Sequence, residues 1–172
     1  DNLEFDQILH SLLAHASAYA VSSTGLAIAA GRISYTLGFQ GPCIALDCAC
    51  ASALVASHSA LRAVQHADCA IALAAGINLI LVPATFAIFQ AAGMTSPRWR
   101  CHTFDHSADG MGRGEACVAA VLQPVDSIWQ SIIVPAAAVR QDGRSASLTA
   151  PNGPAQQMLL RTVLRDSESP QT

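Results

Sequence analysis

Short apolar runs that alternate with longer helical stretches constrain this sequence more than any other feature. The clearest run, Cys69–Ala75, is continuously apolar and ends at Gly76, which predicts a central β-strand covered on both faces. Pro135 lies in another run and favours a sheet edge or a local break there, because proline cannot donate to the ladder. In all, the remaining apolar runs predict strands at residues 43–46, 117–122 and 132–139.

Helical patterns separate these runs. Gly38 supplies a left-handed stop for the first helix, and Asn152 lies where a cap for the last helix is expected. Residues 98–114 are predicted to be loop, and residues 166–172 an unstructured tail. The order of strands and helices indicates an α/β fold. The helices are predicted at residues 26–37, 51–67, 84–92 and 156–165.

Composition bounds what the chain does. The 172 residues fit one domain, and 52% hydrophobic against 12% charged residues require extensive burial, within the chain or against another surface. The net charge is −3, and the nine basic residues are all arginines without a basic stripe, which argues against a nucleic-acid partner. The six cysteines and the lack of a secretory signal favour free, buried thiols in a reducing, cytoplasmic location.

One segment, residues 69–89, is apolar enough to imitate a membrane span. Gly76, Asn78 and Pro83 interrupt it where a spanning helix needs continuity, and its flanks carry no cationic or aromatic belt. A membrane span is therefore not predicted.

The stretch Asp47–Leu54 carries the clearest chemical signal, because a predicted strand there gives way to a helix within a few small residues. Cys50 falls in the first turn of that helix, where the helix dipole and unpaired N–H groups favour a thiolate. The same N–H groups can stabilise a negative oxygen on an attacked thioester carbonyl. Ala49, Ala51 and Ser52 leave room for an acyl chain. From these residues alone Cys50 is a candidate nucleophile, and an inert buried thiol is the alternative.

The histidines of this sequence are weaker candidates for catalysis or metal binding than Cys50 is for a nucleophile. His58 lies eight residues along the predicted helix from Cys50. That separation is about 12 Å at the usual helical rise, too far for proton transfer. Cys101, His102 and His106 lack a second ligand pair at metal-binding spacing, so no metal site is predicted.

Two further patterns have structural explanations. The glycines in Gly110–Gly114 resemble those of a phosphate-binding loop, but they lead into a predicted strand instead of a helix, which favours a role in turns. Phe86, Phe89 and Met94 fit an acyl pocket and an apolar core face equally well, so the substrate-binding residues stay unassigned.

Several motifs follow one another along this chain, from Gly31–Pro42 through Asp47–Cys50 and Gly93–Pro97 to Leu148–Gly153. Together they resemble the motifs of one enzyme family, the ketosynthase (β-ketoacyl synthase) domain of modular type I polyketide synthases. The family motif Asp-Thr-Ala-Cys, followed by small residues, corresponds to Asp47–Cys50, so the resemblance assigns the acyl-accepting nucleophile to Cys50 and places Cys48 at the usual Thr position. The motifs cover most of the chain from about Ala18 to Leu164. They are Gly31–Pro42, Asp47–Cys50, Gly93–Pro97, Thr103–Asp105, Asp109–Glu115, Gln141–Ser145 and Leu148–Gly153.

The resemblance implies a thiolase-like fold with αβαβα layers, of which residues 1–172 form a partial ketosynthase domain that supplies most of the first half. It implies an acyltransferase of the 3-oxoacyl synthase type, usually a homodimer. The Cys50 thiolate accepts an acyl group from an acyl carrier protein for decarboxylative Claisen condensation with a malonyl-type extender. The substrates travel on the phosphopantetheine of that carrier, and no directly bound cofactor or metal is expected. The family's two histidine motifs are expected beyond Thr172, so residues 1–172 alone are expected to be inactive and poorly soluble.

The sequence departs from the family pattern at Cys48, Ala51, Arg140 and Ala146-Ser147, and residues 125–139 are shortened. These departures affect loop conformation more than the identity of the nucleophile. Retention of Cys50 favours a condensing domain over the family's decarboxylating relatives. Two alternatives stay open, a fatty acid synthase ketosynthase and a non-catalytic scaffold or remnant.

Overall fold

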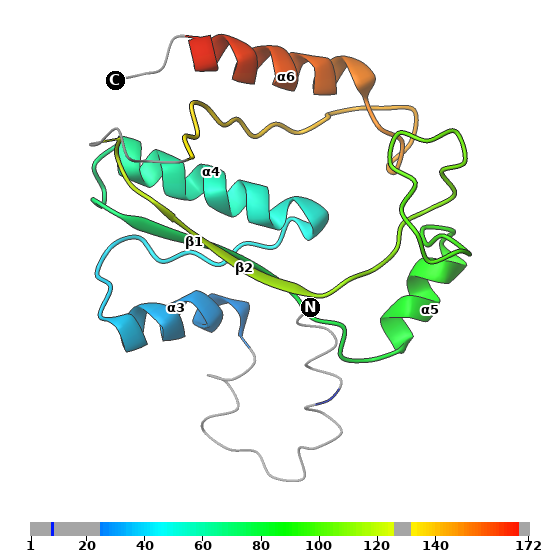
Figure 1. Ribbon diagram of the computed structural model, residues 1–172, viewed down its shortest axis with the longest axis horizontal. Helices are drawn as coiled ribbons and strands as arrows, with labels where there is room; N and C mark the ends of the chain where they lie inside the picture. Colours follow the sequence, from blue (N-terminus) through cyan, green and yellow to red (C-terminus); the bar gives the residue numbers. More distant parts are fainter. Residues whose placement is uncertain (1–7, 9–24, 126–131, 169–172) are drawn as a thin grey trace. The chain divides into compact units, whose positions relative to one another are not determined.

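The computed structural model describes residue 8 and residues 25–125 and 132–168 (Figure 1). Helices and strands alternate along much of this part of the chain, as the α/β prediction requires. The chain divides into two compact units, residues 1–46 with 75–119 and residues 47–74 with 120–172. The elements are α3 (Leu26–Leu37), the 3₁₀ turn η1 (Ala49–Ala51), α4 (Ser52–Gln65), β1 (Ala72–Asn78), α5 (Ala84–Ala91), β2 (Ala116–Leu122) and α6 (Gly153–Glu168).

Helices α3, α4 and α5 end in the same backbone motif. A residue in the left-handed conformation follows each helix, and the next N–H donates to a carbonyl five residues back at 2.9 Å. This Schellman motif satisfies carbonyl groups that the helix end leaves open. The left-handed residues are Gly38, Ala67 and Gly93, with φ of 70°, 60° and 67°. The predicted glycine stop after α3 is therefore confirmed.

The last helix is longer than predicted. It begins at Gly153, where the Ala155 N–H donates to Asn152 Oδ1 at 3.2 Å, so the predicted cap is confirmed. It continues to Glu168, and the prediction of an unstructured tail is wrong for residues 166–168. Residues 169–172 lie outside the described part of the chain.

Strands β1 and β2 pair in a two-stranded sheet. The Asn78 side chain donates to the Gly114 carbonyl, and the Ile80 N–H donates to Glu115 Oε1 at 2.7 Å. The end of β1 therefore lies beside the start of β2, and the strands run in opposite directions (Figure 1). The β2 prediction is confirmed with one extra residue. β1 starts three residues later than predicted and continues through Gly76, the predicted stop, to Asn78.

Two predicted strands are wrong. Residues 43–46 and 132–139 have no strand conformation. A strand requires a hydrogen-bonded neighbour, and within residues 25–125 and 132–168 the sheet consists of β1 and β2. At Pro135 the missing N–H also removes a ladder donor.

Burial is confined to a few positions of the described chain. The buried residues are Ala74, Thr95 and Ser96. Large apolar side chains in both strands stay open to water, with Ile77 60% and Val118 65% exposed. The prediction that β1 is covered on both faces is therefore wrong within this chain. The exposed apolar side chains of the strands remain available to pack against another surface.

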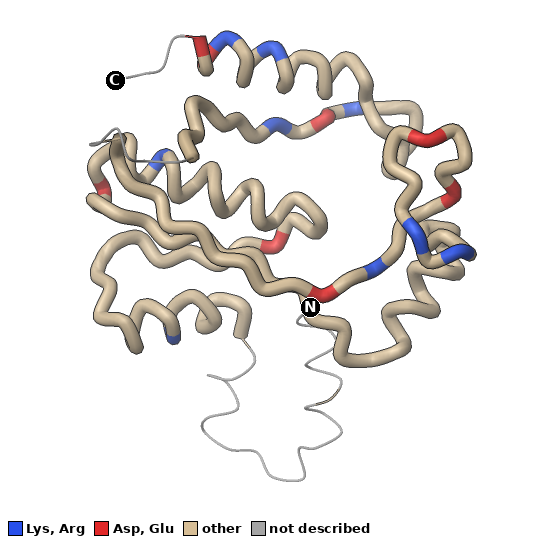
Figure 2. The backbone as a smooth tube through the Cα atoms, viewed as in Figure 1, with Lys and Arg blue, Asp and Glu red and all other residues tan. Residues whose placement is uncertain are grey.

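The apolar segment 69–89 folds as β1 and, after a break, most of α5. Across residues 25–125 and 132–168, every helix is too short or too polar to cross a membrane. The arginines are spread over several helices and loops and are not gathered on one element (Figure 2).

Candidate functional site

Cys50 lies in the middle of η1, directly ahead of α4. Cys50 is exposed. No side chain caps the first turn of α4. The predicted place of Cys50 at the head of a helix is confirmed, whereas the preceding residues 43–46 do not form the predicted strand. All six cysteines are free, as predicted, but the prediction that they are buried is wrong.

The turn before Cys50 has an unusual backbone. Ala49 adopts φ of 51°, in the left-handed region that residues with a Cβ rarely occupy. The Ser52 hydroxyl accepts a hydrogen bond from the Cys48 N–H and donates one to the Ala49 carbonyl, both at 2.8 Å. Asp47 Oδ1 accepts the Ala49 N–H at 3.0 Å. These contacts hold the turn in one conformation.

The sequence pattern does not predict these side-chain contacts. Asp47 is the first residue of the motif Asp47–Cys50, and Ser52 is a small neighbour of Cys50, but neither pattern predicts a hydrogen bond to the backbone. Ser and Asp residues beside a turn commonly bond to nearby backbone groups, and that tendency is the signal that could have found them.

His58 has a structural partner. Its Nδ1 lies 3.1 Å from the Ala137 carbonyl oxygen, which can only accept a hydrogen bond, so Nδ1 carries the hydrogen in this contact. The ring thus links α4 to the segment around Ala137. The prediction that His58 packs and does not activate Cys50 agrees with this contact.

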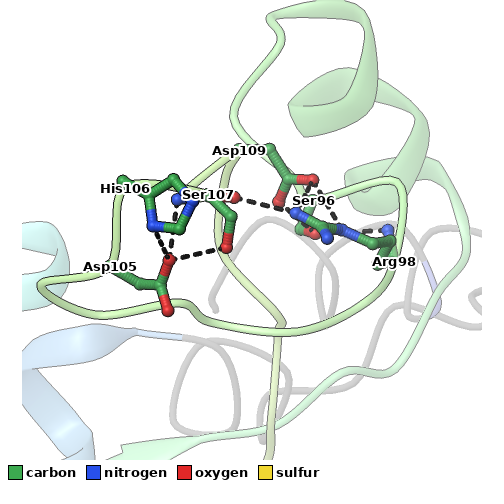
Figure 3. A network of polar contacts seen from close by, with 6 residues as sticks. All are labelled: Ser96, Arg98, Asp105, His106, Ser107 and Asp109. Carbon is green, nitrogen blue, oxygen red and sulfur yellow. Dashed lines mark hydrogen bonds and ion pairs between the residues drawn. The ribbon is translucent and has the colours of Figure 1, made fainter.

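A polar network lies in the loop after α5 (Figure 3). The Ser96 hydroxyl donates to Asp109 Oδ1 at 2.6 Å, and Arg98 forms an ion pair with Asp109 at 2.9 Å. The hydrogen bond from Ser96, with the charge of Arg98 as a smaller cause, holds the pKa of Asp109 below its ordinary value of 3.8. Ser96 is 1% exposed, so the carboxylate anchors a buried residue.

A second acid organises the tip of the same loop (Figure 3). Asp105 Oδ1 accepts the Ser107 N–H at 2.8 Å and the Ser107 hydroxyl at 2.7 Å. These bonds, the backbone one first, lower the pKa of Asp105 from 3.8. His106 Nδ1 lies 3.1 Å from the same oxygen. Within the described residues, no three His, Cys, Asp or Glu side chains are grouped so that they could hold a metal ion.

The glycines of this loop allow close backbone approach. Gly110 has φ of 135°, and a Cβ there would lie 2.5 Å from the Ser96 nitrogen and 2.5 Å from the Thr95 carbonyl carbon. A Cβ on Gly112 would lie 2.9 Å from the Trp99 carbonyl oxygen. The segment then continues into β2, so the prediction of turn glycines is confirmed.

The aromatic side chains of α5 pack on a cation. The Arg113 guanidinium carbon lies 4.9 Å from the centre of the Phe86 ring and 5.0 Å from that of Phe89. The Phe86 ring also meets Trp99 edge-on, with centroids 5.5 Å apart. These contacts favour a packing role for both phenylalanines. Met94 is 47% exposed.

A cavity of about 410 Å³ opens beside this loop. Its lining includes neither Cys50 nor Phe86, Phe89 or Met94, the three residues predicted to fit an acyl pocket or a core face. The lining residues are Gln90, Gly93, Thr95, Ser96, Pro97, Trp99 and Asp109.

Comparison with known proteins points to one family. Residues 6–127 match the family described as "Beta-ketoacyl synthase, N-terminal domain". A phenolphthiocerol/phthiocerol polyketide synthase of Mycobacterium tuberculosis is 42% identical over 156 residues, which is 88% of this chain. The spectinabilin polyketide synthase system protein NorA' of Streptomyces orinoci is 41% identical over 145 residues, or 81% of this chain.

Solved structures agree. The oxazolomycin ketosynthase domain OzmH KS7 of Streptomyces albus JA3453 matches 94% of this chain with a TM-score of 0.83 and 31% identity. The ketosynthase from module 6 of the bacillaene synthase of Bacillus subtilis 168 matches 90% of this chain with a TM-score of 0.75 and 32% identity. The chain spans 28% and 29% of these structures, and 7% and 4% of the two synthases.

Proposed function

Because this chain belongs to the β-ketoacyl synthase family, we propose that residues 1–172 form part of a polyketide synthase ketosynthase domain and carry its acyl-accepting nucleophile, Cys50. The family match over residues 6–127 confirms the predicted ketosynthase resemblance. The likeness to solved ketosynthase domains confirms the thiolase-like α/β fold. The matched relatives are polyketide synthases, which favours that class over a fatty acid synthase.

One observation carries the catalytic assignment. Within the family match, Cys50 is an exposed thiol at the head of α4, at the position that the Asp-x-x-Cys motif marks. The Ala51 and Ser52 N–H groups are bonded within η1, to the Cys48 and Ala49 carbonyls, but the backbone N–H groups at the start of a helix and its dipole still favour negative charge on a nearby sulfur or oxygen. Solvent access and these N–H groups are the two conditions that a nucleophilic thiol needs here.

In the proposed reaction, the Cys50 thiolate attacks the carbonyl carbon of an acyl thioester carried on the phosphopantetheine of an acyl carrier protein. A new carbon–sulfur bond forms to Cys50, the carbon–sulfur bond to the carrier breaks and the carrier leaves as its thiolate, and the Cys50 N–H stabilises the oxyanion in between. A malonyl-type extender then loses carbon dioxide. The resulting carbanion attacks the acyl carbonyl, which releases a β-ketoacyl thioester and restores the Cys50 thiolate. The proposal assigns the two histidines that promote this step to sequence outside the 172 residues.

The proposed partners follow from this chemistry. They are the acyl carrier protein, acyl and malonyl-type thioesters, and a second copy of the domain in a homodimer. Six free thiols suit a reducing location, and we include the cytoplasm in the proposal for that reason.

Acyl loading tests the proposal. The intact synthase that carries this sequence is incubated with an acyl thioester and examined by peptide mass spectrometry. We expect the acyl mass on the peptide with Cys50, and loading at background after Cys50→Ala. A Cys48→Ala variant is the matched control, because it removes the neighbouring thiol and leaves Cys50. Label that persists after Cys50→Ala, or that lies on Cys48, contradicts the assignment, and no label on unaltered protein favours a non-catalytic scaffold.

A further inference from the structure

The peptide between Ala49 and Cys50 holds two groups that matter for the proposed chemistry. The Ala49 carbonyl and the Cys50 N–H belong to the same planar, trans unit, so they point in opposite directions and rotate together. Whatever fixes the carbonyl therefore also fixes the N–H. The proposed function, on which this inference rests, makes that N–H a donor to the oxyanion.

Two groups of Ser52 hold this carbonyl: its backbone N–H donates to the Ala49 oxygen, and its hydroxyl adds a second hydrogen bond to the same oxygen. The hydroxyl donates to the Ala49 oxygen at 2.8 Å and accepts the Cys48 N–H at 2.8 Å. The Ser52 side chain thus links the Cys48 N–H, before Ala49, to the Ala49 carbonyl, which follows it in the chain. Ser52 is half-buried and lies in the first position of α4, so its own backbone is fixed by the helix.

Ala49 needs such a constraint. Its φ of 51° is unfavourable for a residue with a Cβ, and a conformation of this kind persists only where surrounding contacts hold it. Asp47 supplies a third contact, because its Oδ1 accepts the Ala49 N–H at 3.0 Å. Without the Ser52 hydroxyl, the 49–50 peptide loses the side-chain hydrogen bond on its carbonyl.

We propose that Ser52 is a positioning residue for the ketosynthase reaction: its bond to the Ala49 carbonyl aims the Cys50 N–H at the oxyanion. Ser52 does not touch the reacting atoms in this scheme. It acts through the peptide plane that it holds.

Two reactions of the Cys50 thiol, acylation and alkylation, distinguish a positioning role of Ser52 from a general structural role. Attack on an acyl thioester develops an oxyanion, whereas alkylation by iodoacetamide displaces iodide at a saturated carbon and develops none. Both rates depend on the access and charge of the Cys50 sulfur. Only acylation also uses the Cys50 N–H as a donor to a developing oxyanion, so misdirecting that N–H is expected to slow acylation more than alkylation.

The experiment measures both rate constants in the intact synthase for unaltered protein, Ser52→Ala, Ser52→Thr and Ser57→Ala. Loss of one whole oxyanion donor costs about 10²–10³-fold, and a misdirected donor costs less, so we expect Ser52→Ala to slow acylation by roughly 10- to 100-fold. Alkylation of Cys50 is expected to change by less than about threefold, because the thiolate itself is kept. Ser52→Thr keeps the hydroxyl and is expected to restore acylation. Among the described residues, the Ser57 hydroxyl bonds along its own helix, to the Ala53 carbonyl at 2.8 Å, and its alanine variant is expected to have no effect.

Each outcome decides the question. Equal acylation rates in unaltered protein and Ser52→Ala overturn the positioning role while the proposed function of Cys50 stands. Equal losses of acylation and alkylation also overturn it, because they indicate a structural defect at the thiol. If Ser52→Ala unfolds, Ser52→Thr decides, since slow acylation with normal alkylation in that folded variant contradicts the role of the hydroxyl. Absence of acylation in unaltered protein overturns the proposed function and this inference together.

Discussion

Replacing Gly110 by alanine tests how the loop after α5 is built. Thr95 and Met111 form a parallel bridge, in which the Ser96 N–H donates to the Met111 carbonyl at 3.0 Å and the Met111 N–H donates to the Met94 carbonyl at 2.9 Å. An added Cβ at Gly110 would lie 2.5 Å from the Ser96 nitrogen and 2.9 Å from the Thr95 oxygen. These are backbone atoms of buried residues, so a flexible side chain cannot move aside to relieve the clash.

Two costs add in this variant. A φ of 135° is open to glycine and costs alanine about 1–3 kcal/mol. Overpacking against fixed atoms costs about 1–3 kcal/mol more. We therefore expect Gly110→Ala to lower the free energy of unfolding by roughly 2–6 kcal/mol. Gly114→Ala is the matched control, because nothing lies within 4 Å of its added Cβ and its φ is not in the positive range, so a change below about 1 kcal/mol is expected.

Thermal unfolding followed by circular dichroism, with limited proteolysis of residues 93–114, measures both variants in the intact protein. Each 1 kcal/mol shifts the midpoint by about 2–4 °C in a domain of 150–250 residues, and by less in a larger one. A Gly110→Ala protein that melts within a degree of the unaltered protein and resists protease equally would refute the close backbone packing. A similar loss in Gly114→Ala would show that glycine content, and not this contact, sets the stability.

Two other changes test the polar contacts. Asn152→Ala removes the Ala155 bond and two bonds from the Asn152 side chain, at 2.9 Å to the Asp142 carbonyl and 3.3 Å to that of Arg144. It is expected to cost about 1–2 kcal/mol in urea unfolding, and an unchanged free energy of unfolding would contradict the cap. For Asp109, whose folded-state pKa is depressed below 3.8 mainly by the Ser96 hydroxyl, the stabilisation is present at neutral pH and is lost as the pH falls through that lowered pKa. Asp109→Asn is therefore expected to melt lower than unaltered protein at pH 7, with the gap closing below about pH 4; a gap independent of pH would refute the carboxylate's role.

Local signals predicted most of the secondary structure. The bounds of α3 and β2 could be predicted to within one residue. A glycine stop marks the end of the α3 helical pattern, and polar or turn residues mark both ends of the apolar run that forms β2. Residues 43–46 have the same apolar character as β2 but no strand partner among the described residues. Strand formation depends on a neighbour, and a single apolar run does not reveal one.

The site was predictable in part. Cys50 could be placed at a helix start because small residues follow a turn and precede a helical pattern. The Ser52 contacts depend on the left-handed Ala49, and a residue with a Cβ gives no sequence sign of that conformation. The Ser96–Asp109 bond joins residues thirteen positions apart through a loop, and spacing alone does not predict such a pair.

The open edges of β1 and β2 have a consequence for synthesis of the protein. Within the described residues each strand pairs on one side only, so its other row of N–H and C=O groups is available to any extended chain. Many proteins protect such an edge with lysine, and this sequence contains none. Protection against misassembly at this sheet therefore falls to the segments that pack beside it, and the order in which they fold becomes a determinant of yield.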